Sequence, residues 1–221
     1  MKKSVTGLLA AALLVTGAGQ APAQDLAKIC GSIGGVGMGD WAEYTMEGPN
    51  AAQVSGVRFA LVHRGEVAKP WFELKANTVQ GEQVVQLQVP GFPFGPTDVA
   101  DGIMKAGPMP AMRLPEQMIG MMKQQMMSNP MFDVQVQCLA SELVGEETVE
   151  VPAGRIKAWH LRVSEGEAWV SPDVPFGIVR GESAEGGDVM VLAGHGSDAT
   201  SSIPEEPQAM PAMPAGPPPR D

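Results

Sequence analysis

One stretch of the chain departs from the pattern around it, and over residues 105–131 it reads KAGPMPAMRLPEQMIGMMKQQMMSNPM. Together with Met104, this stretch holds nine of the fifteen methionines. The sequence on either side alternates apolar and polar residues, a period that is typical of β-strands. We therefore expect one methionine-rich helix inserted among strands.

Prolines bound this helix. Pro115 suits the first helical position, where its missing N–H costs nothing, and Pro130 disfavours helical angles at Asn129. At 100° per residue the apolar side chains fall within one arc and the polar ones lie mostly opposite, so the helix is amphipathic. The arc contains Leu114, Met118, Ile119, Met121, Met122 and Met126, whereas Met127 lies outside it.

Three interpretations of the methionine face are open. In the first, the helix packs on the sheet. In the second, the helix is a flexible lid over an apolar ligand cavity, because methionine is soft and repacks easily. The third is a Cu(I) site, since thioethers favour this ion and Met118, Met122 and Met126 follow i,i+4 spacing. No His or Cys lies in the stretch and Ile119 continues the same arc. We therefore predict no metal site here.

Short alternating segments predict an antiparallel meander with one apolar face and one wet face. Before the helix they lie at residues 40–46, 57–61, 72–76 and 85–89. The proline-rich residues 89–96, which include Phe92 and Phe94, then leave the sheet. After the helix the segments are residues 132–138, 147–151, 155–163, 168–170, 177–182 and 188–193. We expect an α+β, mainly β fold of about nine or ten strands with one dominant helix, packed on the sheet or over its mouth.

The ends of the chain are not expected to belong to the domain. Residues 1–23 read as a secretory signal peptide, with a basic start, a short apolar run and a small-x-small cleavage site. The run is too short to span a bilayer, and the lysine at position 28 fits a lipid-attachment site at Cys30 poorly. We assign residues 24–38 to a glycine-rich leading segment and 39–198 to the domain, with a helical insertion at about 96–130. Residues 199–221 are rich in proline and predict a disordered tail.

Charge and cysteines point to an extracytoplasmic protein. Loss of Lys2 and Lys3 with the signal peptide changes the formal charge from −10 to −12. An acidic chain without a basic cluster argues against binding to nucleic acid or to anionic membranes. In an oxidising compartment Cys30 and Cys138 favour one disulfide, and two buried free thiols are the alternative.

Nothing local marks a catalytic or metal site. The three histidines, His63, His160 and His195, are far apart, without zinc-ligand spacing. No nucleophile elbow of the G-x-S-x-G type is present. We expect a protein that is not an enzyme and has no cofactor.

Several phrases of the sequence resemble a known family. They are GDWAEY at 39–44, WFEL at 71–74, ETVEVPAG at 147–154, AWVSPDVPFGIV at 168–179 and VLAGHGSDA at 191–199. Together they resemble uncharacterised exported bacterial proteins with a fold similar to the LolA/LolB lipoprotein carriers. The resemblance implies a curved antiparallel half-barrel whose mouth is covered by helices, and in the carriers that cavity holds acyl chains. This chain has one clear helix where the carriers have several.

The leading hypothesis is a non-catalytic periplasmic protein that binds an apolar ligand, a lipid or a lipidated partner, with no stable membrane insertion. The expected ligand-binding residues are Met118, Met121, Met122 and Met126, with Phe92 and Phe94 at the approach to the helix. The alternatives are a Cu(I)-binding methionine-rich protein and a structural partner in envelope assembly that uses its acidic proline-rich tail. The oligomeric state stays open.

Overall fold

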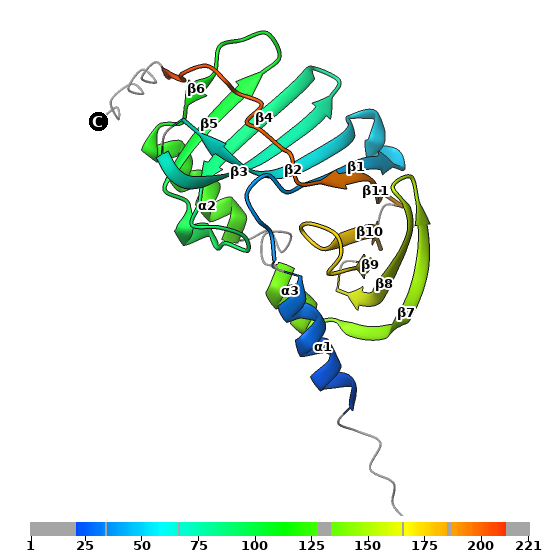
Figure 1. Ribbon diagram of the computed structural model, residues 1–221. Helices are drawn as coiled ribbons and strands as arrows, with labels where there is room; N and C mark the ends of the chain where they lie inside the picture. Colours follow the sequence, from blue (N-terminus) through cyan, green and yellow to red (C-terminus); the bar gives the residue numbers. More distant parts are fainter. Residues whose placement is uncertain are drawn as a thin grey trace, which may run out of the picture.

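The fold is mainly β, built on one large curved sheet (Figure 1). The computed structural model describes residues 21–33, 35–65, 67–127, 134–164, 166–184 and 187–210. Twelve strands form the sheet in the order β12-β6-β5-β4-β3-β2-β1-β11-β10-β9-β8-β7. The strands are β1 Trp41–Glu47, β2 Val54–Arg64, β3 Val67–Thr78, β4 Gly81–Gln88, β5 Asp101–Ala106, β6 Met112–Arg113, β7 Glu142–Val151, β8 Gly154–Val163, β9 Gly166–Val170, β10 Ile178–Ser183, β11 Val189–Gly196 and β12 Gln208–Ala209.

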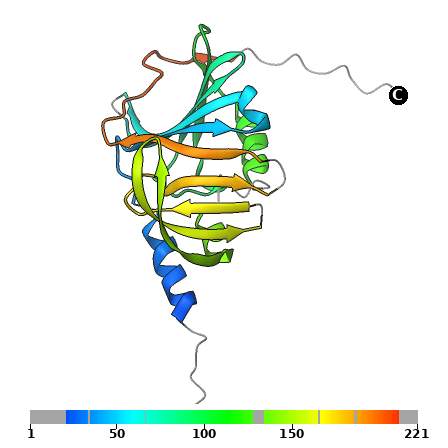
Figure 2. The same cartoon turned by 90° about the vertical axis from the view of Figure 1, so that its right-hand side faces the viewer.

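Neighbouring strands run antiparallel, except that β12 pairs with β6 in parallel, so the sheet is mixed. Two meanders, β1–β6 and β7–β11, are joined where β1 pairs with β11 from Trp41 opposite Gly196 to Glu47 opposite Val189. In Figure 2 the orange strand β11 lies between β1 of the first meander and β10 of its own. The sheet is not closed, because β12 and β7 stand at its opposite ends.

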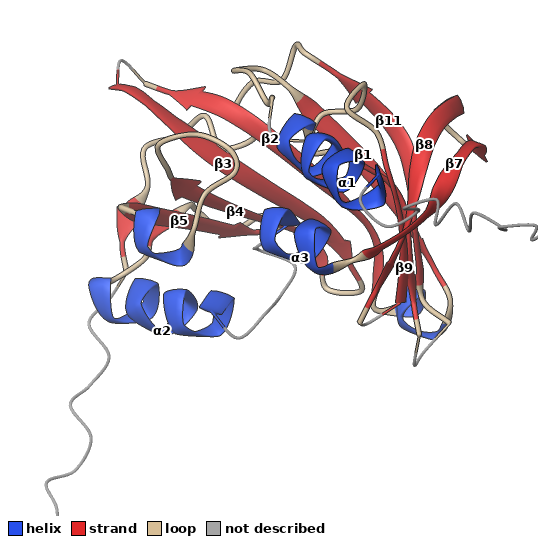
Figure 3. Ribbon diagram, turned by 90° about the horizontal axis from the view of Figure 1, so that it is seen from below, coloured by secondary structure: helices blue, strands red, loops and turns tan. Residues whose placement is uncertain are grey.

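Three short helices occur in the described ranges, on the concave side of the sheet (Figures 1 and 3). They are α1 Ala21–Ser32, α2 Glu116–Met127 and α3 Val134–Ala140. The methionine-rich helix α2 is confirmed, and it starts directly after Pro115. No described helix is long and apolar enough to cross a membrane.

The predicted disulfide is confirmed, but one predicted strand is wrong. Cys30 of α1 is bonded to Cys138 of α3, with Sγ atoms 2.01 Å apart. Both cysteines are buried with Leu161 of β8. The alternating segment around Cys138 was expected to be a strand and forms helix α3 instead, because packing against α1 and β8 outweighs the weak β preference of a short apolar run. The bond also engages the thiol of Cys30, which was considered above as a lipid-attachment residue.

The insertion at residues 96–130 is helical only in its second half. A 3₁₀ turn at Pro96–Asp98 precedes β5, which pairs with β4 so that Met104 lies opposite Val85. Strand β6 follows and pairs with β5. These strands, with β12, raise the strand number above the nine or ten expected. Strands β6 and β12 are two residues each, too short to show a two-residue alternation.

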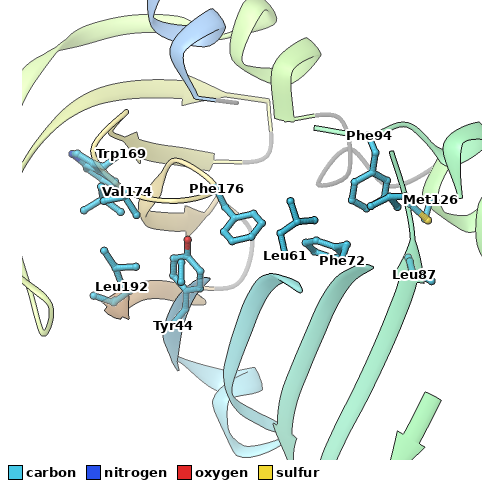
Figure 4. Packing of buried hydrophobic residues seen from close by; sticks show 14 of the residues in the cluster. Tyr44, Leu61, Phe72, Leu87, Phe94, Met126, Trp169, Val174, Phe176 and Leu192 are labelled. Carbon is cyan, nitrogen blue, oxygen red and sulfur yellow. The ribbon is translucent and has the colours of Figure 1, made fainter. Parts of the chain in front are cut away.

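Both faces of the first meander are covered. The inner face carries Leu61, Phe72 and Leu87 in one row, within the main core cluster (Figure 4). The outer face was expected to be wet, yet it holds a second cluster of buried residues. That cluster contains Ala60, Val62, Trp71, Val84, Ile103, Ala111 and Ile203.

Ile203 belongs to the segment that covers this outer face, residues 199–209, which we call the C-terminal strap. Ile203 is 1% exposed, and Arg64 Nη1 donates to its carbonyl oxygen at 2.5 Å. At the far end β12 pairs with β6, and Lys105 Nζ hydrogen-bonds Glu205 at 2.6 Å, which holds the pKa of Glu205 below its usual range. The expectation of a disordered tail is therefore wrong for residues 199–210, where one apolar anchor and several hydrogen bonds compensate for the prolines. Residues 211–221 lie outside the described ranges.

A buried polar pair lies beneath the strap. Glu73 is 1% exposed, and its carboxylate accepts from Gln86 Nε2 at 2.6 Å and from the backbone and hydroxyl of Ser202 at 2.8 and 2.7 Å. Buried polar groups are tolerated when they are hydrogen-bonded in this way. The strap thus supplies partners that the sheet alone lacks.

The start of the chain also differs from the expectation. The proposed signal peptide, residues 1–23, lies outside the described ranges except for its last three residues, which begin α1. The leading segment, residues 24–38, was expected to be a glycine-rich loop. Its first part is helix α1 up to Ser32, and α1 packs on α3 through the disulfide.

Candidate apolar ligand site

A cavity of about 190 Å³ opens between the concave face of the sheet and the loops that cross it. Strands β1, β2, β3, β10 and β11 form its floor, and residues 89–95 and 171–177 close it from above. Every lining residue is apolar. The lining residues are Met46, Val57, Phe59, Phe72, Leu74, Phe92, Phe94, Phe176, Ile178 and Met190.

Aromatic rings form one wall of this apolar cavity. The ring centroids of Phe92 and Phe176 are 4.9 Å apart, and those of Phe72 and Phe94 are 5.1 Å apart. Phe59 extends the wall, 5.9 Å from Phe176. Figure 4 shows Phe72, Phe94 and Phe176 converging from three separate segments. The wall therefore exists only when both loops are folded onto the sheet.

The loop that carries Phe176 is tightly fixed. Ser171 N–H donates to the Gly177 carbonyl at 2.8 Å, and Gly177 N–H donates to the Val174 carbonyl at 2.9 Å. Phe176 has φ of 65° and Gly177 has φ of 78°. Positive φ is costly for a bulky residue such as phenylalanine, so the surrounding contacts hold this side chain in place. A Cβ on Gly177 would meet Ile33 Cγ2 at 2.1 Å, and only glycine fits there.

Tyr44 places its ring beside the cavity floor, 5.5 Å from the ring of Phe59. Its hydroxyl donates to the Ile178 carbonyl at 3.1 Å. Burial raises the pKa of Tyr44 well above its ordinary value, so the phenol stays neutral. The floor therefore contributes no charge to the cavity.

Two of the six predicted ligand-binding residues, Phe92 and Phe94, line the cavity, and the four methionines of α2 do not. Met126 is 4% exposed and belongs to the main core cluster. Met118 and Met122 are half-buried against the same cluster. Met121 is 53% exposed. The arc of α2 thus packs mainly on the inner face of the sheet, which was the first of the three interpretations.

Two other methionines line the cavity, and sequence reasoning missed them. Met46 of β1 lies directly opposite Met190 of β11 in the strand register. Met46 is the last residue of the predicted strand at 40–46, and Met190 lies within the predicted strand at 188–193. The signal was an isolated methionine at an inward strand position, which the cluster of methionines in α2 obscured.

The chemistry that this cavity offers is apolar contact. An apolar cavity of about 150 Å³ stays dry and takes up benzene-sized molecules, so a cavity of this size suits an aromatic ring or part of an alkyl chain. No titratable side chain is among the described lining residues. The described residues also hold no group of three or more His, Cys, Asp or Glu arranged for a metal ion.

Comparisons with known proteins add little to this geometry. The chain matches no model of a known protein family and no curated protein. A proposed exported protein with a YmcC-like fold from Bacteroides fragilis NCTC 9343 is 15% identical with a TM-score of 0.34, covering 73% of this chain and 97% of that one. A proposed lipoprotein from Parabacteroides distasonis ATCC 8503 is 12% identical with a TM-score of 0.36, covering 72% and 96%.

TM-scores of this size support no inference about function, and we draw none from them. Neither comparison links the chain to the LolA/LolB carriers, so that resemblance stays a prediction.

Proposed function

We propose that this chain is a non-catalytic exported protein that binds the apolar part of a lipid, or of a lipidated partner, in the aromatic-walled cavity. The observation that carries the proposal is the lining, in which all ten residues are apolar. A pocket that excludes charge selects hydrocarbon over polar solutes, because an unpaired polar group buried there loses its hydration. A periplasmic location is part of the proposal and rests on the signal-like residues 1–23 and the disulfide.

The size of the cavity sets what it binds. Burial of each methylene is worth about 0.8 kcal/mol, so an alkyl segment of about four methylenes contributes about 3 kcal/mol. The rest of a longer chain stays outside the 190 Å³ volume. We therefore propose that the protein holds one end of a hydrocarbon chain rather than enclosing a whole lipid.

We do not propose Cu(I) binding as a second function. Three of the four candidate methionines, Met118, Met122 and Met126, pack against the apolar core. Their thioethers are thus accounted for by packing, and no further observation favours a soft metal.

The test combines native mass spectrometry with calorimetry. Protein purified from the periplasm is expected to carry a lipid, and isothermal titration with decanol is expected to give saturable binding to the delipidated chain. The variant Val57→Trp fills the cavity from β2 and lowers decanol affinity at least tenfold. The control Val79→Trp adds the same side chain at a residue that is 74% exposed, and it leaves affinity unchanged.

Two results would contradict the proposal. One is the absence of both co-purifying lipid and decanol binding. The other is decanol binding that Val57→Trp leaves intact while the variant keeps its fold by circular dichroism, because the ligand would then lie elsewhere.

A further inference from the structure

Solvent exposure divides the methionines of this chain into two groups. Met109, Met121 and Met127 are 58%, 53% and 68% exposed. Twelve methionines lie in the described ranges, and the other nine are buried or half-buried. The strongly exposed thioethers of the described residues are therefore gathered within residues 109–127.

Packing does not account for the three exposed methionines. Met118, Met122 and Met126 are the methionines of α2 that contact the main core cluster. Met121 and Met127 lie on the same helix but face solvent, and Met109 lies in the turn before β6. An exposed side chain buries little apolar surface and gains little stabilisation from it. The property that distinguishes these three residues is the chemistry of an accessible thioether.

Thioethers are also the accessible reduced sulfur of this chain. Its two cysteines, Cys30 and Cys138, are joined in the disulfide, so neither offers a thiol to an oxidant. The disulfide indicates an oxidising compartment. There a methionine side chain is converted to its sulfoxide, and an oxidant in solution reaches exposed sulfur before buried sulfur.

Oxidation of the less exposed methionines would harm both the core and the cavity. A sulfoxide oxygen is polar, and its burial without a hydrogen-bond donor is costly. Met126 is 4% exposed in the main core cluster, and Met118 and Met122 pack against the same cluster. Met46 and Met190 line the apolar cavity. These five residues benefit if the oxidant is consumed elsewhere.

We propose that Met109, Met121 and Met127 form a sacrificial oxidation site, which consumes a hypohalous acid such as hypochlorous acid before it reaches the methionines of the core and cavity. The sulfur lone pair attacks chlorine and hydroxide leaves. Water then adds its oxygen to sulfur, and chloride and two protons leave, one of which neutralises the hydroxide. Sulfur thus loses two electrons to chlorine, and one thioether and one hypochlorous acid give one sulfoxide, one chloride and one proton.

The modification is reversible in chemical terms. A methionine sulfoxide reductase restores the thioether with two thiols, which become a disulfide as the oxygen leaves in water. Because the three side chains project into solvent, their sulfoxide oxygens are hydrated and the fold is kept.

The experiment follows the order in which the methionines are oxidised. The purified full chain receives hypochlorous acid in steps, up to one molecule for each of the three exposed methionines, and excess free methionine stops the reaction. Peptide mass spectrometry then measures sulfoxide at each position. Sulfoxide is expected first at Met109, Met121 and Met127, while Met126 stays reduced and the circular dichroism spectrum is unchanged.

A variant with Met109→Leu, Met121→Leu and Met127→Leu tests the sacrificial role. Leucine keeps the apolar character and the helix propensity and removes the sulfur. At the same oxidant dose this variant is expected to carry about threefold more sulfoxide at Met118 and Met122 than the unaltered chain. The control Val79→Leu changes a residue that is 74% exposed and keeps all three thioethers, so it leaves the distribution of sulfoxide unchanged.

Two outcomes would overturn the inference. One is sulfoxide at Met118, Met122 or Met126 that forms as early as at the exposed methionines of the unaltered chain. The other is an equal amount of sulfoxide at Met118 and Met122 in the triple variant and the unaltered chain, because the exposed sulfur atoms would then protect nothing. Neither measurement involves a lipid, so either outcome leaves the proposed function standing.

Discussion

Truncation of Ile203 to alanine tests whether the C-terminal strap is part of the folded domain. Ile203 is 1% exposed and contacts an outer-face cluster that includes Trp71 and Ile103. Removal of a buried Ile side chain to Ala costs about 2–5 kcal/mol, from lost transfer energy and the cavity left behind. Of the strap residues, Ile203 and Ala199 pack in this cluster, so the strap is held by few apolar contacts and is able to relax into the gap. We therefore expect a loss near the lower end, about 2–3 kcal/mol.

The measurement is urea unfolding followed by circular dichroism, with the free energy taken by linear extrapolation. Val79→Ala is the matched control, because Val79 is 74% exposed and its truncation is expected to cost less than about 0.5 kcal/mol. A change of the same small size in Ile203→Ala would refute the reasoning, since it would mean that the strap does not cover the outer face in solution.

Three further predictions concern the disulfide, the Phe176 loop and the buried carboxylate. Replacement of both Cys30 and Cys138 by serine is expected to cost about 2–5 kcal/mol in urea unfolding, and a loss below about 1 kcal/mol would contradict a stabilising bond. Gly177→Ala forces a side chain into an occupied position at positive φ, and it is expected to lower the melting temperature and decanol affinity together, whereas Gly181→Ala in β10 has room and leaves both unchanged. Glu73→Ala removes the acceptor of three hydrogen bonds, one buried and two partly buried, and is expected to cost about 3 kcal/mol; a neutral result would contradict a stabilising role for these bonds.

The parts of the fold that sequence reasoning predicted are those set by local patterns. Strands β2, β3 and β4 have clean two-residue alternation, and their inner faces are buried as the alternation predicts. Helix α2 has proline at its start and an apolar arc. The disulfide followed from two cysteines and an oxidising compartment. Each of these signals lies within a short window of sequence or in composition.

The parts of the fold that sequence reasoning missed depend on contacts between distant segments. Helix α3 has the period of a strand, and only packing on α1 and β8 makes it helical. The strap looks disordered by composition, because its anchor is the single residue Ile203 among prolines. The cavity joins Met46 of β1 to Phe176, which are far apart in the sequence. A concentration of methionine in α2 drew attention to a face that packs on the core instead.

The most direct test of the central claim uses the methionines as reporters. Protein labelled with ¹³C at the methionine methyl groups is titrated with decanol and followed by nuclear magnetic resonance. The account predicts that the signals of Met46 and Met190, which line the cavity, shift with saturation, while that of Met127, which is 68% exposed, stays in place. Shifts confined to the methionines of α2, with Met46 and Met190 unchanged, would contradict it and place the ligand on the helix.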